Sequence, residues 1–238
     1  MQKEENMGGI LEKIREVEGF LEEIEAKFLF LKAKECSKGS VIVEIGSWKG
    51  KSTICLAEGS KTGSRAKVYA IDPHTGSKEH GNVWTFPEFK KNIAKFGHED
   101  IVVPIVKTSR ETIKDWNKPI GLLFIDGSHE YEDVKFDFEA WSPFVVEGGI
   151  VAFHDFFRYE GVTRVARKGL FFSRSFKDVG LIHSIAYGRK VHKNTIIEWI
   201  RNFFYFGYNY IWMISKKIIP SFVAIPLGKI LRKMHLLK

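Results

Sequence analysis

The chain has 238 residues, of which 44% are hydrophobic and 28% are charged, a composition typical of a globular protein and not of a disordered or fibrous one. Its two cysteines, Cys36 and Cys55, are too few for a disulfide framework and indicate a reducing, cytoplasmic compartment. The net charge of +8 is concentrated in residues 195–238, where seven basic residues and one acid give +6, so the body of the chain is nearly neutral and no nucleic-acid partner is expected.

Residues 1–38 are predicted to form an N-terminal helical segment. The first residues, MQKEENMGG, contain acids where a signal peptide has a basic and then an apolar region, so no export is expected. Apolar residues then recur at steps of four and three from Ile10 to Leu31, which is the pattern of an amphipathic helix. The heptad spacing suits packing on the chain's own domain or, as the alternative, on a partner helix in a homodimer.

Residues 39–192 are predicted to form one α/β domain. Apolar runs predict strands at residues 41–45, 68–71, 101–106, 122–125, 150–153 and, last, 180–189. Amphipathic runs predict helices near residues 52–58, 87–96, 110–117, 131–141 and 162–168. Most of the strands are apolar throughout, as is typical of parallel strands covered by helices on both faces. The alternation therefore predicts a doubly wound, Rossmann-like sheet.

The glycine loop GSWKGKS follows the first predicted strand and opens a helix. A phosphate-binding Walker loop needs four residues between its glycines, and only three lie between Gly46 and Gly50. Asp72 ends the second predicted strand, where an acid can accept hydrogen bonds from the hydroxyls of a ribose. The pattern favours a ligand that has a ribose but no diphosphate.

Polar residues follow the fourth and fifth predicted strands, in FIDGSHEYED and VAFHDFF. If these strands are neighbours, Asp126 and Asp155 point into one site at the edge where open α/β sheets bind ligands. Two close carboxylates repel unless a cation or a shared proton lies between them, and Mg²⁺ is the simplest such cation.

These motifs together resemble the class I S-adenosylmethionine-dependent methyltransferases, in the small-molecule and sugar O-methyltransferase branch that includes cephalosporin-hydroxylase-like and macrocin O-methyltransferase-like proteins. The resemblance covers about Gly19 to Arg189. It implies a seven-stranded sheet with an antiparallel last strand, S-adenosylmethionine over the first two strands, and the methyl acceptor over the fourth and fifth. The cofactor-binding residues that follow from it are Glu44, Gly46, Ser47, Gly50, Ser52, Asp72, Ser109 and Asp126.

Three of these assignments keep alternatives. Glu44 is expected to orient the loop amides or the methionine amino group, or else to be a strand-end acid in solvent. Ser109 is expected to contact adenine or to be a helix N-cap. Members of the branch hold a metal with acids at the ends of the fourth and fifth strands, and His154 stands here where a second acid often does, so Asp126, His154 and Asp155 are the expected metal ligands.

The catalytic residues are expected to be Asp126, His129 and His154, and three readings stay open: a metal-assisted reaction, direct base catalysis by a histidine, and acids that only cap loops. The reaction expected is O-methylation of a sugar or other small-molecule hydroxyl. The alternative is a non-catalytic scaffold protein that binds S-adenosylmethionine or a nucleotide. The fourth strand ends in Asp-Gly-Ser-His, which is not the signature of enzymes that methylate nucleic-acid bases.

Residues 193–238 are predicted to form an aromatic and basic helical tail. Its longest uncharged run, residues 202–215, is too short to span a membrane. Its aromatic and basic residues suit a helix that lies on the inner face of an anionic membrane, near a lipid-linked acceptor. The alternative is an arm folded over its own domain or over a dimer partner.

Overall fold

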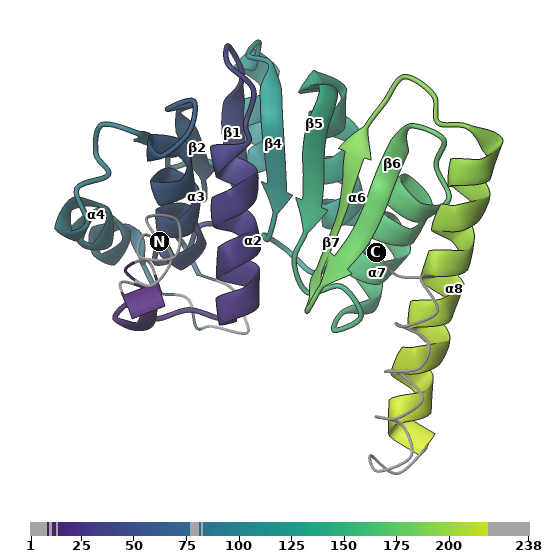
Figure 1. Cartoon of the computed structure of the whole chain (residues 1–238). Coiled ribbons are helices and arrows are strands. Elements are labelled where there is room, and N and C mark those ends of the chain that lie inside the picture. The colour runs from purple at the N-terminus through teal and green to yellow at the C-terminus, as the bar shows by residue number, and fades with distance from the viewer. Residues whose placement is uncertain (1–8, 10, 13, 77–80, 82, 219–238) are drawn as a thin grey trace.

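A seven-stranded sheet forms the centre of the molecule. The computed structural model describes residues 9, 11–12, 14–76, 81 and 83–218 (Figure 1). The strands are β1 Val41–Ile45, β2 Val68–Ile71, β3 Val102–Ile105, β4 Ile120–Ile125, β5 Val145–Phe153, β6 Phe176–Ile182 and β7 Ile185–Lys190. They lie in the order β3-β2-β1-β4-β5-β7-β6, with parallel pairing from β3 to β5 and antiparallel pairing of β7 with β5 and β6. The predicted doubly wound, mostly parallel α/β sheet is confirmed.

Helices cover both faces of this sheet. They are α2 Glu23–Lys34, α3 Lys51–Lys61, α4 Phe86–Lys95, α5 Ser109–Thr112, α6 Tyr131–Trp141, α7 Glu160–Ala166 and α8 Ile196–Ile218. Short 3-10 or π-helical turns, η1 Ile113–Asp115, η2 Ser142–Phe144 and η3 Arg167–Phe171, continue α5, α6 and α7. Helices α2 and α3 lie on one face of the sheet, and α6 and α7 lie on the other (Figure 1).

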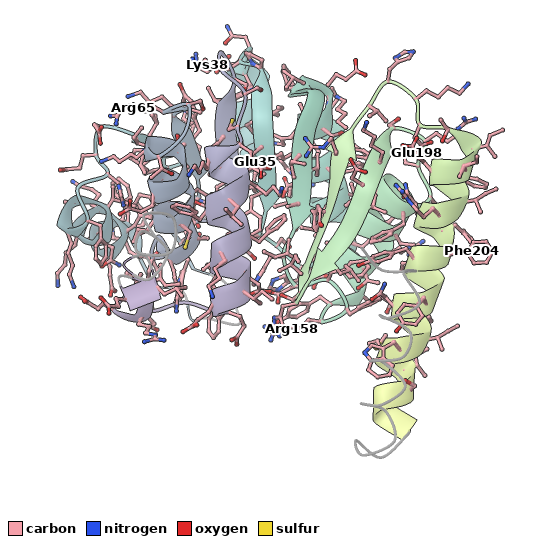
Figure 2. All side chains as sticks on the ribbon, viewed as in Figure 1. Glu35, Lys38, Arg65, Arg158, Glu198 and Phe204 are labelled. Carbon is pink, nitrogen blue, oxygen red and sulfur yellow. The ribbon has the colours of Figure 1, made fainter. Side chains whose placement is uncertain are left out.

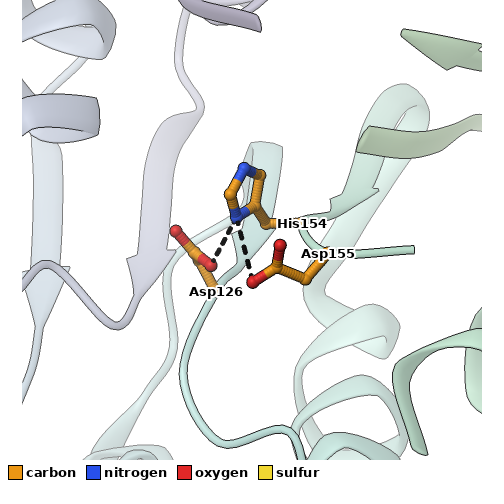
Figure 3. Close-up of side chains that lie close together, drawn as sticks. All are labelled: Asp126, His154 and Asp155. Carbon is orange, nitrogen blue, oxygen red and sulfur yellow. Dashed lines mark hydrogen bonds and ion pairs between the residues drawn. The ribbon is translucent and has the colours of Figure 1, made fainter. Parts of the chain in front are cut away.

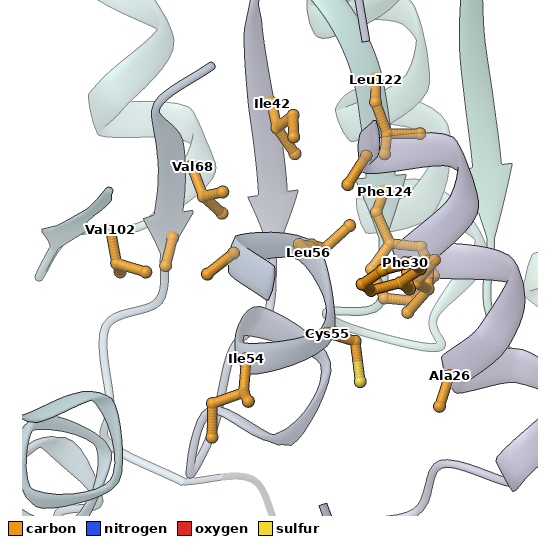
Figure 4. Close-up of a cluster of buried hydrophobic side chains, with 14 of the residues drawn as sticks. Ala26, Phe30, Ile42, Ile54, Cys55, Leu56, Val68, Val102, Leu122 and Phe124 are labelled. Atoms are coloured by element: carbon orange, nitrogen blue, oxygen red, sulfur yellow. The ribbon is translucent and has the colours of Figure 1, made fainter. Parts of the chain in front are cut away.

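Two hydrophobic clusters, one on each face of the sheet, explain why the strand sequences are continuously apolar. Ile42 of β1 belongs to a cluster under α2 and α3 that includes Phe30 and Ile54 (Figure 4). Its neighbour Val43 belongs to the cluster on the opposite face, with Trp141 of α6. Because successive side chains of a strand point to opposite faces, both kinds of position must be apolar here.

The predicted N-terminal helix differs from the observed one. Its first apolar residue, Ile10, lies outside the described residues, and no helix covers residues 16–22. In α2, Ile24 and Leu31 are exposed at 53% and 44%, although the heptad pattern predicts that they are buried. The helix instead buries the face that contains Phe30, which is 4% exposed. At this face α2 crosses α3 closely. A Cβ at Gly59 of α3 would lie 2.1 Å from the Phe30 backbone oxygen, so only glycine allows the crossing.

The predicted single last strand over residues 180–189 is wrong. The structure has two strands, β6 and β7, which are joined by a turn at His183 and Ser184. His183 has a left-handed backbone, with φ 52°, and neither residue is the glycine, asparagine or proline that usually marks a hairpin. The sequence therefore shows no turn signal at this position.

Helix α8 ends the described part of the chain. One face of it packs on the domain, where Phe206 and Asn202 are 7% and 1% exposed and Asn202 Nδ2 donates a hydrogen bond to the Phe176 carbonyl at 3.1 Å. Within the described residues, no helix is both long enough and apolar enough to cross a membrane. The basic residues of the predicted tail that lie outside the described residues are Lys229, Arg232, Lys233 and Lys238.

Candidate active site at the carboxyl ends of the strands

The loop between β1 and α3 depends on its glycines. Gly46 and Gly50 have left-handed backbones, with φ 87° and 89°, which glycine adopts without steric cost. Trp48, between them, is also left-handed, with φ 42°. A Cβ at Gly46 would lie 2.2 Å from the backbone oxygen of Asp126. Only glycine therefore lets this loop approach the end of β4, and the contact joins the predicted cofactor-binding region to the predicted acceptor-binding region.

Asp72, directly after β2, fixes the same loop. Its Oδ2 accepts hydrogen bonds from the backbone N–H groups of Ser47 and Trp48, both at 2.8 Å. Its Oδ1 accepts one from the N–H of His74 at 2.6 Å. The sequence predicts that Asp72 binds ribose hydroxyls, and the structure adds a second task, which is to order the loop. Because a carboxylate oxygen has two acceptor positions, Oδ1 can still accept a further donor.

Glu44 lies in β1, just before the loop, and is fully buried at 0% exposure, so the alternative of an acid in solvent is wrong. Its Oε2 accepts a hydrogen bond from Thr53 Oγ1 at 2.5 Å, whereas Oε1 has no partner among the described residues. Burial raises the pKa of Glu44 to about 8, although the hydroxyls of Ser52 and Thr53 oppose this shift. The buried hydroxyl of Ser47 also lacks a partner in the described part of the chain.

Ser109 follows β3 at the start of α5. The alternative that it is the helix N-cap is wrong, because Thr108 is the N-cap and its side chain accepts the hydrogen bond from the N–H of Glu111. The hydroxyl of Ser109 instead donates to Asp137 Oδ1 at 2.5 Å. Burial raises the pKa of Asp137 to about 6, and the hydrogen bond from Ser109 only partly offsets it.

Asp126, His154 and Asp155 meet where β4 and β5 end (Figure 3). His154 Nδ1 lies 3.0 Å from Asp126 Oδ1 and 3.6 Å from Asp155 Oδ2. One ligand atom from each of the three residues lies within 4.8 Å of the others. The structure thus brings together the three side chains that the sequence predicts as metal ligands.

His129 lies on the other side of Asp155. Its Nε2 is 3.3 Å from Asp155 Oδ2, and its ring stacks on Tyr159 with a centroid distance of 3.8 Å. Arg158 Nη1 donates to the other carboxylate oxygen at 3.1 Å. Burial acts to raise the pKa of Asp155, but the hydrogen bonds from His129 and His154 outweigh it and hold the pKa well below its ordinary value.

Glu25 of α2, which no motif of the sequence predicts, completes the cluster. Its Oε2 lies 3.3 Å from His154 Nε2, so each nitrogen of this ring faces a carboxylate. Burial acts to lower the pKa of His154, but the surrounding acids outweigh it and raise the pKa to about 12. The available signal was an acid at helical spacing from buried apolar residues, four before Leu29 and eight before Ala33.

Comparison with known proteins identifies the domain. Residues 43–156 match the model of a family described as a methyltransferase domain. This segment of the chain is similar to a methyltransferase domain. The match begins in β1 and extends past His154 and Asp155, so it includes the glycine loop, Asp72 and the acid cluster. The match agrees with the methyltransferase resemblance that the sequence motifs predict.

Two curated relatives align with about half of this chain. An uncharacterized protein of Sinorhizobium fredii is 31% identical over 120 residues, which are 48% of this chain and 13% of that protein. An uncharacterized protein of Acanthamoeba polyphaga mimivirus is 28% identical over 130 residues, which are 49% of this chain and 52% of that protein. The chain thus covers about half or less of the length of these relatives.

Solved structures share the methyltransferase fold. The O-methyltransferase NovP has a TM-score of 0.61 and 14% identity, over 71% of this chain and 80% of NovP. CalS11, a TDP-rhamnose 3′-O-methyltransferase of calicheamicin biosynthesis, has a TM-score of 0.53 and 19% identity, over 69% and 76%. An O-methyltransferase from Bacillus cereus in complex with SAH has a TM-score of 0.55 and 17% identity, over 78% and 91%. At these identities the likeness concerns the fold alone.

Proposed function

We propose that the methyltransferase domain transfers a methyl group from S-adenosylmethionine to a hydroxyl of a sugar or another small molecule. The close approach of Gly46 to the end of β4 at Asp126 carries this proposal, because it joins a loop suited to the cofactor to acids and histidines suited to a hydroxyl. Among the proteins that share the fold, CalS11 is described as acting on TDP-rhamnose.

The residues around the glycine loop fit S-adenosylmethionine. Backbone N–H groups at the start of α3 suit the carboxylate of its methionine part. The unpartnered Oε1 of Glu44 and hydroxyl of Ser47 are buried polar atoms that its amino group could satisfy. Asp72 Oδ1 can accept a ribose hydroxyl beside the N–H of His74. Gly46, Gly50, Ser52, Ser109 and Asp126 would complete the cofactor site, as the family resemblance implies.

His129 is the general base in this proposal. Asp155 orients its ring through the 3.3 Å contact, and Tyr159 stacks on it. The ordinary pKa of histidine suits proton transfer near neutral pH. His154 does not suit this role, because each of its ring nitrogens already faces a carboxylate. Since the methyl donor is already activated, most of the catalysis comes from alignment, which can supply roughly 7–11 kcal/mol at best.

Asp126, His154 and Asp155 also fit a divalent cation such as Mg²⁺. Two carboxylates and an imidazole are protein ligands for such ions, and their ligand atoms lie within 4.8 Å of one another. Metal ligands must be deprotonated, so His154 Nδ1 would bind the cation in place of its proton. A cation bound there would make the acceptor hydroxyl more acidic. His129 keeps the role of base with or without it.

Removal of divalent cations tests this assignment. We expect EDTA to lower the turnover of a hydroxyl-bearing sugar nucleotide by about tenfold or more, and excess Mg²⁺ to restore it, because the acceptor hydroxyl loses its proton less readily without the cation. Mass spectrometry of the methylated product measures the rate. Full activity in EDTA would contradict the metal and leave direct base catalysis by His129. Binding of S-adenosylhomocysteine without turnover of any hydroxyl acceptor would favour the non-catalytic scaffold.

The outer face of α8 is apolar and exposed. Its members are Ile197, Ile200, Phe204, Ile211 and Ile214, with exposures of 80%, 42%, 68%, 68% and 37%. They recur at steps of three, four, seven and three, so they form one stripe along the helix. Figure 2 shows Phe204 directed away from the sheet, and α8 extends beyond the edge at which β4 and β5 end (Figure 1).

This apolar stripe is proposed to contact an anionic membrane surface. The inner face of α8 packs over its own domain, where Phe206 and Asn202 are buried. The alternative of an arm folded over the domain therefore describes this face and not the apolar stripe. The charge of +6 in residues 195–238 is complementary to anionic lipid. Because α8 passes the edge that holds the acid cluster, the membrane would lie on the acceptor side of the domain, which suits a lipid-linked hydroxyl acceptor.

Substitution of the stripe tests membrane binding. The double variant Ile197→Ser, Phe204→Ser is expected to bind vesicles of phosphatidylserine and phosphatidylcholine about tenfold or more weakly than wild type, because burying each side chain contributes about 1.5–3 kcal/mol. Co-sedimentation of the full chain measures this affinity. The matched control is Val83→Ser, which removes an apolar side chain that is 59% exposed elsewhere. Equal pelleting of the double variant would contradict the proposal, and a dimer lost in that variant would assign the stripe to self-association.

A further inference from the structure

Glu25 connects three separate parts of the chain. Its side chain is 1% exposed, although it lies in an N-terminal helix 129 residues before His154 and 159 before Ser184. Its Oε1 accepts hydrogen bonds from the backbone N–H and the hydroxyl of Ser184, at 2.9 and 2.6 Å, and lies 3.1 Å from His183 Nδ1. Its Oε2 accepts one from the N–H of Glu22 at 3.0 Å and faces His154 Nε2 at 3.3 Å.

The direction of the contact between Glu25 and His154 follows from these bonds. The carboxylate is surrounded by donors from Glu22, just before α2, and from the turn between β6 and β7, and an ionised carboxylate has no proton of its own to donate. The hydrogen atom in the 3.3 Å contact therefore belongs to His154 Nε2. Figure 3 shows the consequence, because the other ring nitrogen, Nδ1, faces Asp126 and Asp155.

We infer that Glu25 is a positioning residue of the active site: its carboxylate fixes the His154 ring with Nε2–H turned into the protein and Nδ1 turned toward Asp126 and Asp155. Partners of this kind behind a metal-binding histidine typically change metal affinity or activity by about 10- to 100-fold when they are lost. The effect on turnover rests on the proposed function, whereas the state of the ring does not. Helix α2 is thus part of the site, although the family match begins at residue 43.

Glutamine at position 25 would reverse the hydrogen bond to His154. Its amide has one oxygen and one NH₂ group, and the oxygen must face the two donors of Ser184. The NH₂ group is then left to face His154 Nε2, and the N–H of Glu22 loses its acceptor. A donor at this position favours the ring form with a bare Nε2 and a proton on Nδ1. Glu25→Gln therefore keeps the size of the side chain and moves the ring proton to Nδ1, the nitrogen that faces Asp126 and Asp155.

The test compares wild type with Glu25→Gln in the full chain labelled with ¹⁵N histidine. NMR detects which ring nitrogen of His154 carries a proton, and His154→Gln assigns the signals by their loss. We expect a protonated Nε2 in wild type. In Glu25→Gln we expect an unprotonated Nε2, a kcat about 10- to 100-fold lower, a weaker affinity for Mg²⁺, and an unchanged KM for S-adenosylmethionine.

Ser184→Ala is the matched control. It removes a hydroxyl donor from Oε1 of Glu25 and leaves the contact of Oε2 with His154. It should lower the melting temperature, as Glu25→Gln should, because both variants remove a hydrogen bond in this cluster, but it should keep Nε2 of His154 protonated. A Glu25→Gln variant with a protonated Nε2 and wild-type kcat would show that Glu25 only packs the helix, and the inference would be overturned. If wild type methylates no acceptor, the proposed function fails, and the nitrogen signals still decide the position of the ring.

Discussion

Replacing Asp155 by asparagine is expected to lower kcat by about 10²- to 10⁴-fold, while the affinity for S-adenosylhomocysteine stays close to that of wild type. Asp155 contacts both the proposed base His129, at 3.3 Å, and His154, at 3.6 Å. Its charge therefore serves proton transfer and cation binding together. Asparagine tolerates the left-handed backbone that Asp155 adopts, with φ 57°, so the variant removes the charge and keeps the chain path.

A control and a second variant separate this effect from a general loss of structure. Asp133→Asn removes an exposed carboxylate that pairs with Arg110 at 3.2 Å, and it should leave kcat unchanged because such surface pairs contribute about 0–1 kcal/mol. Asp126→Asn should resemble Asp155→Asn, since Asp126 Oδ1 lies 3.0 Å from His154 Nδ1. Turnover rates and calorimetry of S-adenosylhomocysteine measure both quantities. Wild-type turnover in both Asp155→Asn and Asp126→Asn would place the chemistry elsewhere.

Sequence reasoning succeeds where neighbouring residues determine the site. Gly46, Asp126 and Asp155 each follow an apolar strand by one or two residues, and the carboxyl ends of parallel strands share one edge of the sheet. Their proximity therefore follows once the strand order is known. The left-handed φ of Gly46 is likewise a local requirement of a strand-to-helix turn.

Glu25 could not be placed by the same reasoning. Its partners His154 and Ser184 lie 129 and 159 residues further along the chain, and which face of α2 is buried depends on the close crossing of α2 over α3 at Gly59. The heptad pattern instead selected Ile24, which is exposed. A buried acid pays its desolvation cost through tertiary partners, and those partners are not visible in the spacing of apolar residues.

The turn between β6 and β7 was missed for a related reason. It is held by the two hydrogen bonds from Ser184 to Glu25, as well as by its own strand pairing. Residues in such a turn need no glycine or asparagine of their own, because a distant side chain stabilises the conformation. The missed turn and the missed acid therefore have the same cause, which is the pair of hydrogen bonds between Ser184 and Glu25.

Replacing Asp72 by alanine is expected to raise the Kd for S-adenosylhomocysteine by about 100-fold or more, with a smaller effect on kcat at saturating cofactor. The substitution removes the acceptor for the backbone N–H groups of Ser47, Trp48 and His74. A hydrogen bond to a charged group contributes about 1.5–3 kcal/mol, and about 2.8 kcal/mol corresponds to 100-fold in affinity. Calorimetry measures the affinity, and Asp100→Asn, which alters an exposed acid paired with Lys61 and Arg65, is the control.

Hydrogen exchange separates the two tasks of Asp72. If Asp72 orders the glycine loop, the amides of Ser47 and Trp48 should exchange faster in Asp72→Ala even without cofactor, because they lose the acceptor at 2.8 Å. If Asp72 only held the ribose, exchange in the free protein would not change and affinity alone would fall. Unchanged affinity together with unchanged exchange would contradict both roles, and with them the placement of the cofactor over β1 and β2.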